Sequence, residues 1–183
     1  MKNLYESLLD DFNTISKSSD KSIKEEIRAF LNKHYMGGTL GDKCKISKNP
    51  DVDGKYIVDI TARNIQVIQK GLTHLTNSYF KFGTVKVKQS FTCHLCNDLL
   101  SLEGAPRYIE GNFICYGCPN LTSLEGAPEI VSGDFTCYDC KNLKSIIGIP
   151  KEVDGTFVYD DPFTEQDIRK YCDVKKRVIK KNK

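Results

Sequence analysis

The chain of 183 residues has no tryptophan, only two methionines and only three histidines. It contains no run of about 20 apolar residues, which is the length that a membrane-spanning helix needs. Its first residues, MKNLYESLLDDF, place acidic side chains where a secretory signal requires an uninterrupted apolar stretch. These absences predict a protein that stays in the cytoplasm, where cysteines are normally kept reduced.

Sequence motifs of the common catalytic sites are missing as well. There is no glycine-rich phosphate loop followed by Lys-Ser or Lys-Thr, no GxSxG sequence and no HExxH pair. His34 is expected to end a helix, where a cationic side chain is favourable. The sequence therefore predicts no catalytic residue, no cofactor and no enzyme activity.

Basic residues barely outnumber acidic ones, so the net charge is only +3. Nucleic-acid binding proteins usually carry a larger positive charge gathered on one face. The basic residues that stand out lie near the C-terminus, in the segments 175–177 and 180–181. This pattern predicts a solvated basic tail, which is the one place where nucleic acid could bind, as a weak accessory.

What the sequence does contain is an internal repeat, whose period of about 22 residues lies in the range of known solenoid units. Phenylalanine recurs with this step, and glycine stands two residues before the last three of the four phenylalanines. In the first three units, two cysteines, two leucines or isoleucines and a Gly-x-Pro segment follow in the same register. The phenylalanines that define the units are Phe91, Phe113, Phe135 and Phe157.

The repeat predicts stacked coils. Alternation in Phe-x-Cys places both side chains on one face of a short strand, and the three-residue spacings that follow suit a tight return path. A single coil cannot bury its apolar face, whereas stacked coils can. We therefore expect an α+β protein in which residues 1–40 form a helical cap, 41–163 a strand lead-in and β-solenoid, and 164–183 a capping helix with the basic tail.

These units resemble the short class of bacterial leucine-rich repeats, over about residues 72–159. Phe113 and Cys115 stand where that class has paired leucines, and Cys118 stands where it has Asn or Cys. The glycine two residues before Phe113, Phe135 and Phe157 departs from the pattern. More narrowly, LYESLLDDF, the repeated LTSLEGAP with its cysteine pair, and FTEQDIRKYCDV are similar to a family of repeat proteins of uncharacterised biochemistry in phages of gut bacteria. That resemblance implies a phage origin and a binding role.

The N-terminal region predicts two helices followed by strands. Leu4, Leu8, Phe12 and Ile15 describe the apolar face of the first helix. Ser22 with Glu25 is expected to form a capping box at the start of the second helix, which the glycines at 37–38 would end. Residues 43–67 then indicate strands interrupted by a turn at 49–54.

The C-terminal region predicts a further helix. Thr164 with Asp167 is expected to cap a helix that contains Ile168 and closes the open edge of the solenoid.

The cysteine pairs allow three interpretations. Two successive Cys-x-x-Cys pairs are separated by a spacer whose length matches a four-cysteine zinc site. However, the whole framework repeats with the cysteines, and Tyr159 and Pro162 replace them in the fourth unit. We therefore favour packing of small apolar side chains over zinc, and both over redox chemistry, which lacks activating neighbours. The alternative zinc ligands are Cys93, Cys96, Cys115, Cys118, Cys137 and Cys140.

A candidate binding face follows from the same alternation, because residues between the inward Phe and Cys must point outward. Tyr116 and Tyr138 are the expected anchors, since tyrosine combines a large contact area with a polar tip. The other interpretation is a cross-strand pair that only stabilises neighbouring strands. The predicted partner-binding residues are His94, Asn112, Ile114, Tyr116, Asp134, Thr136, Tyr138, Val158 and Asp160.

Together these features predict a protein that binds another protein without catalysis. With the phage resemblance, the expected partner is a host factor, and inhibition of a bacterial defence system is the sharper hypothesis. Two alternatives stay open at this point: a minor virion or assembly protein, and a zinc-stabilised module that binds nucleic acid through its basic tail.

Overall fold

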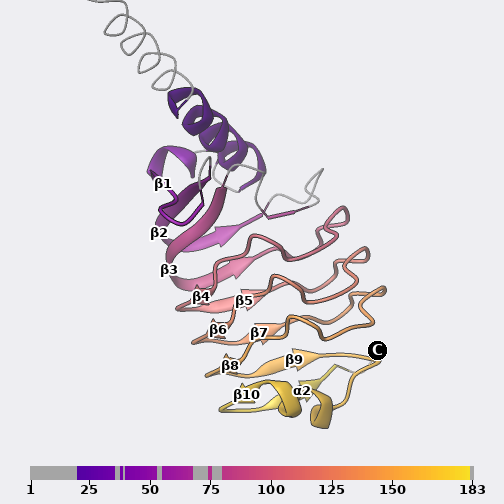
Figure 1. Ribbon diagram of the computed structural model, residues 1–183. Helices are drawn as coiled ribbons and strands as arrows, with labels where there is room; N and C mark the ends of the chain where they lie inside the picture. Colours follow the sequence, from indigo (N-terminus) through magenta and orange to yellow (C-terminus); the bar gives the residue numbers. More distant parts are fainter. Residues whose placement is uncertain are drawn as a thin grey trace, which may run out of the picture.

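The computed structural model is an α+β protein built on a β-solenoid, with helical segments near both ends (Figure 1). The structure describes residues 20–35, 38, 40–52, 55–67, 74–75 and 80–181. The helix predicted for Leu4 to Ile15 lies outside these residues. Within them, no helix has the length and apolar character needed to cross a membrane.

The N-terminal part begins with a helix that covers residues 20–34 of the described chain. Because this helix already includes residues 20 and 21, Ser22 lies inside it, and the predicted capping box with Glu25 is wrong. The helix ends at His34, as predicted. Its buried side chains Ile27 and Leu31 pack into the same core as the solenoid.

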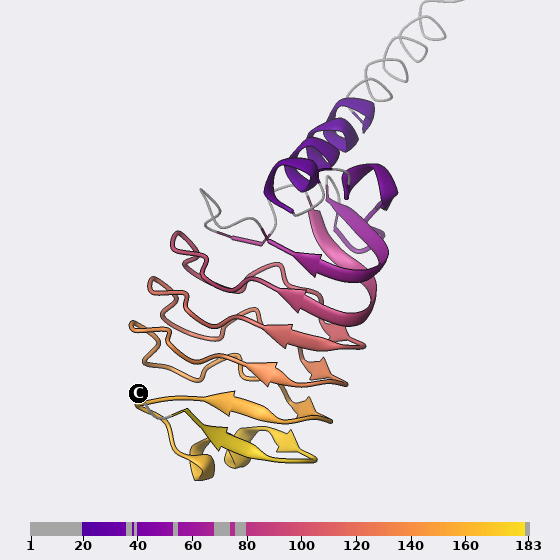
Figure 2. The ribbon, with the colours of Figure 1, turned by 180° about the vertical axis from the view of Figure 1, so that it is seen from behind.

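A short 3-10 helix, η1 (Gly41–Lys43), and three strands join this helix to the coils. Strand β1 (Lys45–Lys48) runs antiparallel to β2 (Tyr56–Gln66), and β2 runs parallel to β3 (Phe80–Thr92). Two register shifts occur where β2 pairs with β3. As Figure 2 shows, both long strands curve around the end of the solenoid, so they begin the stack as the sequence predicts.

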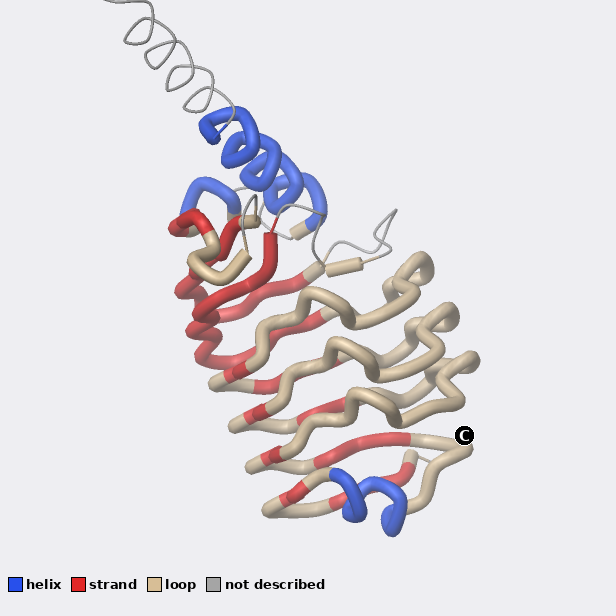
Figure 3. Tube along the Cα trace, viewed as in Figure 1, coloured by secondary structure: helices blue, strands red, loops and turns tan. Residues whose placement is uncertain are grey.

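Each following coil adds one parallel strand to each of two sheets (Figure 3). A seven-stranded sheet has the order β1-β2-β3-β5-β7-β9-β11, and a four-stranded sheet has the order β10-β8-β6-β4. The sequence predicted the first sheet but only a coiled return path in place of the second. The new strands are β4 (Tyr108–Ile109), β5 (Asn112–Ile114), β6 (Ile130–Val131), β7 (Phe135–Thr136), β8 (Glu152–Val153) and β9 (Phe157–Tyr159).

The core is a set of ladders in which equivalent side chains of successive coils touch. Phe91, Phe113, Phe135 and Phe157 are fully buried and stack, with ring centroids 5.6, 5.4 and 4.9 Å apart. The glycine of each Gly-x-Pro segment makes this close stacking possible. Gly126 has φ +83°, and a Cβ there would lie 2.5 Å from the backbone of Glu103 in the preceding coil.

At the far end, α2 (Glu165–Tyr171) begins with the predicted capping box between Thr164 and Asp167. The chain then continues into β10 (Asp173–Val174) and β11 (Val178–Lys180), which pair in parallel with β8 and β9. The expectation of a free basic tail after the helix is therefore wrong over residues 173–180, because these residues form the last coil. The final strands β10 and β11 follow α2 in the chain, and one of them ends each sheet.

Candidate interaction face

The predicted binding residues gather on the outward side of the seven-stranded sheet, which we call the strand face. Parallel register aligns them in three columns that run across the coils. In the polar column Asp134 lies between Asn112 and Thr156. In the β-branched column Thr136 lies between Ile114 and Val158. The aromatic column contains His94, Tyr116 and Tyr138.

The aromatic column is a continuous stack of rings. The rings of His94 and Tyr116 lie 5.1 Å apart with an interplanar angle of 13°, and those of Tyr116 and Tyr138 lie 5.0 Å apart with an angle of 4°. All three side chains are half-buried. Because the ring faces contact one another, the stack offers mainly edges and hydroxyl groups to a partner. The stacking also shows that the stabilising role considered from the sequence is present.

The polar column is partly engaged in holding the coils in register. The amide of Asp134 donates to Asn112 Oδ1 at 2.8 Å, and the amide of Thr156 donates to Asp134 Oδ1 at 2.7 Å. These bonds satisfy backbone donors at the sharp bend before each strand. Asn112 and Asp134 thus have a structural function on the strand face, because each holds a backbone amide of the next coil.

Asp160 does not lie on the strand face as a freely exposed group. It is 8% exposed, and its Oδ2 accepts the amide of Asp139 at 2.8 Å. Asp139 has φ +53°, a backbone conformation that is uncommon for residues other than glycine. The Asp160 carboxylate therefore stabilises an unfavourable turn. The prediction that Asp160 is exposed for binding is therefore wrong.

Two residues of the last coil join the strand face and were not predicted. Ile179 pairs with Val158 and extends the β-branched column, and Lys181 Nζ lies 5.6 Å from the centre of the Tyr138 ring. The available signal was the spacing of Val174 and Val178, which equals that of Val153 and Phe157. Val174 and Val178 follow Val153 and Phe157 by one residue fewer than the length of the repeat, and no glycine precedes Val178 by two. The last coil therefore does not match the sequence pattern of the repeat unit.

The six cysteines of the Cys-x-x-Cys pairs lie behind the strand face, inside the coils. All eight cysteines of the chain are free thiols with buried side chains. Cys118 Sγ donates to the carbonyl of Cys93 at 3.1 Å, and Cys140 Sγ donates to the carbonyl of Cys115 at 3.2 Å. Cys118 and Cys140, the second cysteines of the second and third pairs, therefore link their coils to the preceding ones, which gives them a role in packing.

Burial also shapes the chemistry of these thiols. It raises the pKa of Cys93, Cys115 and Cys137 well above the ordinary value, because a thiolate is poorly solvated there. Such thiols are poor nucleophiles near neutral pH. Over the described residues, no group of three or more histidine, cysteine, aspartate or glutamate side chains is arranged to hold a metal ion.

Comparison of the chain with protein-family models, with curated proteins and with solved structures finds no match.

Proposed function

We propose that this chain is a non-enzymatic protein whose strand face binds another protein. The observation that carries the proposal is the ordered stack of His94, Tyr116 and Tyr138 beside the β-branched column. Binding to a flexible surface fixes the side chains of that surface, at a cost of about 1 kcal/mol for each side chain. Here stacking orders the rings in the unbound protein, so less of the binding energy is lost.

The strand face suits a protein partner better than a nucleic acid. Recognition of a single strand uses open ring faces on which bases stack, together with a groove of cations. The faces of Tyr116 are covered by His94 and Tyr138, and the polar column contains Asp134. Tyrosine side chains, by contrast, are enriched in protein interfaces and among the residues that contribute most to their affinity.

The resemblance to repeat proteins of gut phages supports a more specific proposal about the partner. A phage protein that acts in the host cytoplasm has host factors as its available targets, and inhibition of a bacterial defence system is one such activity. This extension rests on the resemblance alone.

The test is affinity capture from host cells with the full chain as bait, followed by measurement of the affinity for each purified protein that is retained. The variant Y116A/Y138A should bind about 30-fold more weakly, because two interface tyrosines together contribute about 2 kcal/mol. The matched control is Y108A/Y171A, which removes two exposed tyrosines outside the strand face. The control should bind like the wild type.

Circular dichroism establishes that each variant is folded before binding is compared. Equal affinity of folded Y116A/Y138A and wild type would refute the choice of face. Failure of the wild type to retain any protein above the level of an unrelated bait, from infected or uninfected cells, would refute protein binding. Retention of virion proteins alone would replace the host factor with an assembly role.

A further inference from the structure

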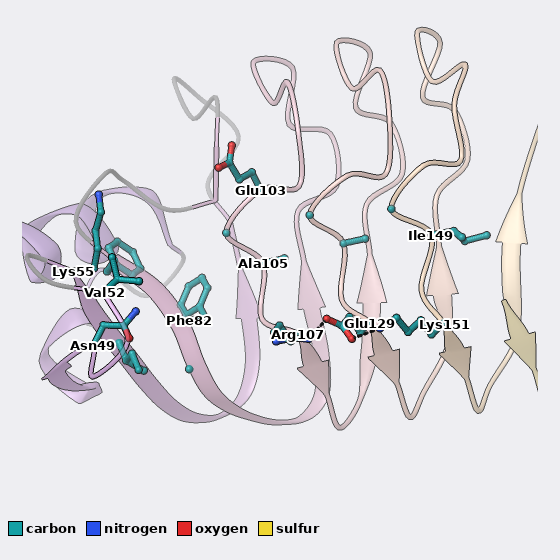
Figure 4. A pocket seen from close by; sticks show the side chains of 17 residues that line it. Asn49, Val52, Lys55, Phe82, Glu103, Ala105, Arg107, Glu129, Ile149 and Lys151 are labelled. Atoms are coloured by element: carbon teal, nitrogen blue, oxygen red, sulfur yellow. Dashed lines mark hydrogen bonds and ion pairs between the residues drawn. The ribbon is translucent and has the colours of Figure 1, made fainter. Parts of the chain in front are cut away.

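A groove lies away from the strand face; its lining extends from the β1–β2 turn past β3 and along the Gly-x-Pro corners of three successive coils (Figure 4). Its volume is about 920 Å³, within the range of about 300–1,000 Å³ that is usual for small-molecule sites. In each coil this corner comes before the strand of the four-stranded sheet, whereas the strand face comes after it. The groove is therefore a separate surface, and nothing in the proposed function uses it.

The floor and walls of the groove are mostly apolar. Ala105, Ala127 and Ile149 occupy equivalent positions in successive coils and form the floor, while Phe80 and Phe82 of β3 close one end. These three floor side chains are only partly buried, although they pack against the core. An apolar molecule in the groove would therefore cover apolar surface that is now in contact with water.

The walls are held in place without a ligand. The Gly126 backbone is fixed against the preceding coil, as described above, and the amide of Ala127 donates to the carbonyl of Leu124 at 2.9 Å. At the end of the groove formed by residues 49–52, Asn49 Oδ1 accepts the amide of Asp51 at 2.9 Å. A site formed in advance binds more tightly, because little order has to be created on binding.

The charges around the groove favour an anion. One carboxylate, Glu129, forms ion pairs with both Arg107 and Lys151, whose side chains are 80% and 75% exposed. The lining also includes Lys55 and Glu103, one charge of each sign, so the excess positive charge of the rim lies at Arg107 and Lys151, which share one carboxylate. The two cations around Glu129 keep most of their surface open to solvent and can receive a second carboxylate.

We infer that this groove binds a small amphiphilic anion, with its apolar chain over Ala127 and its single anionic group between Arg107 and Lys151. The ligand class is a linear or flat apolar molecule that ends in a carboxylate or a similar group. The apolar floor supplies the affinity, and the cations at the rim fix the orientation. Each methylene buried on the floor contributes about fourfold to the affinity, up to the length that the groove accommodates.

The experiment is calorimetric titration of the full chain with sodium dodecanoate below its micelle concentration, repeated with octanoate and with the uncharged dodecanol. We expect saturable binding of one dodecanoate, and weaker binding of octanoate. R107Q/K151Q should weaken dodecanoate binding about three- to tenfold, whereas E129Q should strengthen it about two- to fivefold. Dodecanol affinity should respond to neither change.

The control K141Q/K144Q removes the same charge from two exposed lysines that do not line the groove, and should bind dodecanoate like the wild type. A127F, which fills the floor, should abolish binding of both dodecanoate and dodecanol. The charge variants lie on the surface, so they test the inference even if A127F folds poorly. Absence of saturable binding, equal effects of the groove and control variants, or equal affinity for dodecylammonium would overturn it.

Discussion

Replacement of Cys118 by alanine separates packing from metal binding as the function of the cysteines. Its thiol is fully buried and donates to the carbonyl of Cys93 in the preceding coil at 3.1 Å. Loss of one buried heavy atom costs about 1 kcal/mol. The lost weak hydrogen bond and the small cavity add about 1 kcal/mol more. We therefore expect C118A to lower the free energy of unfolding by about 2 kcal/mol, and Tm by roughly 4–8 °C.

The matched variant is C96A. Cys96 is equally buried, but its Sγ lies 3.6 Å from the carbonyl of His94 in its own coil. C96A should cost about 1 kcal/mol, mainly through lost burial. The difference between the two variants estimates the bond from Cys118 to the carbonyl of Cys93, because both variants remove the contact between the Cys96 and Cys118 thiols. Urea unfolding followed by circular dichroism measures both values.

The same assay with a zinc chelator gives the refuting result. If the cysteines pack, 1,10-phenanthroline leaves the wild-type unfolding curve unchanged. A structural zinc site contributes about 10 kcal/mol or more, so its loss would unfold the chain. Unfolding of the wild type by the chelator, together with complete loss of folding in C118A and C96A, would show that the packing interpretation is wrong.

Two further predictions concern titratable groups. Because all eight thiols are buried, we expect Ellman's reagent at pH 8 to react with the native protein at least about 100-fold more slowly than with the urea-unfolded protein; rapid reaction of several native thiols would contradict this. The hydroxyl group of Tyr56 donates to Asp20 Oδ1 at 2.6 Å. This bond, followed by the one to Lys24, lowers the pKa of Asp20. Burial and the same bond raise the pKa of Tyr56 to about 12. Their contribution to stability is therefore lost as the pH falls below 3.8 through the folded pKa of Asp20, and as it rises from 10 through about 12. Y56F should lower stability by about 1 kcal/mol at pH 7 and flatten both limbs of the pH profile of urea unfolding; unchanged limbs would contradict the coupling.

The repeat made much of the solenoid predictable. Phe113 and Cys115 alternate with outward residues, and the constant step of the repeat aligns them with the next unit, so both the inward core and the strand face follow from spacing. The two-residue strands of the second sheet do not follow, because an isolated pair such as Ile130–Val131 shows no alternation to recognise. Only stacking on the equivalent pair of the next coil gives it a partner.

The ends of the solenoid were harder to predict for a different reason. At Ser22, the local capping signal was overridden, because residues 20 and 21 are already helical and Ser22 lies inside the helix. At the C-terminus, Val178 takes the place of a phenylalanine without the preceding glycine, so the last coil has the contacts of the repeat but not its sequence. The groove combines the turn at Asn49 with corners that lie far along the chain, a proximity that only the folded chain reveals.

The constant step between Phe113, Phe135 and Phe157 has a consequence for how such a protein can change during evolution. Each coil contacts mainly its two neighbours, so a duplication of one repeat unit would insert one whole coil without altering either end. Such an event lengthens the aromatic stack and the groove together, by one ring and one floor position. The size of both surfaces is therefore inherited as a whole number of units, and it can change in a single genetic step while each old contact is kept.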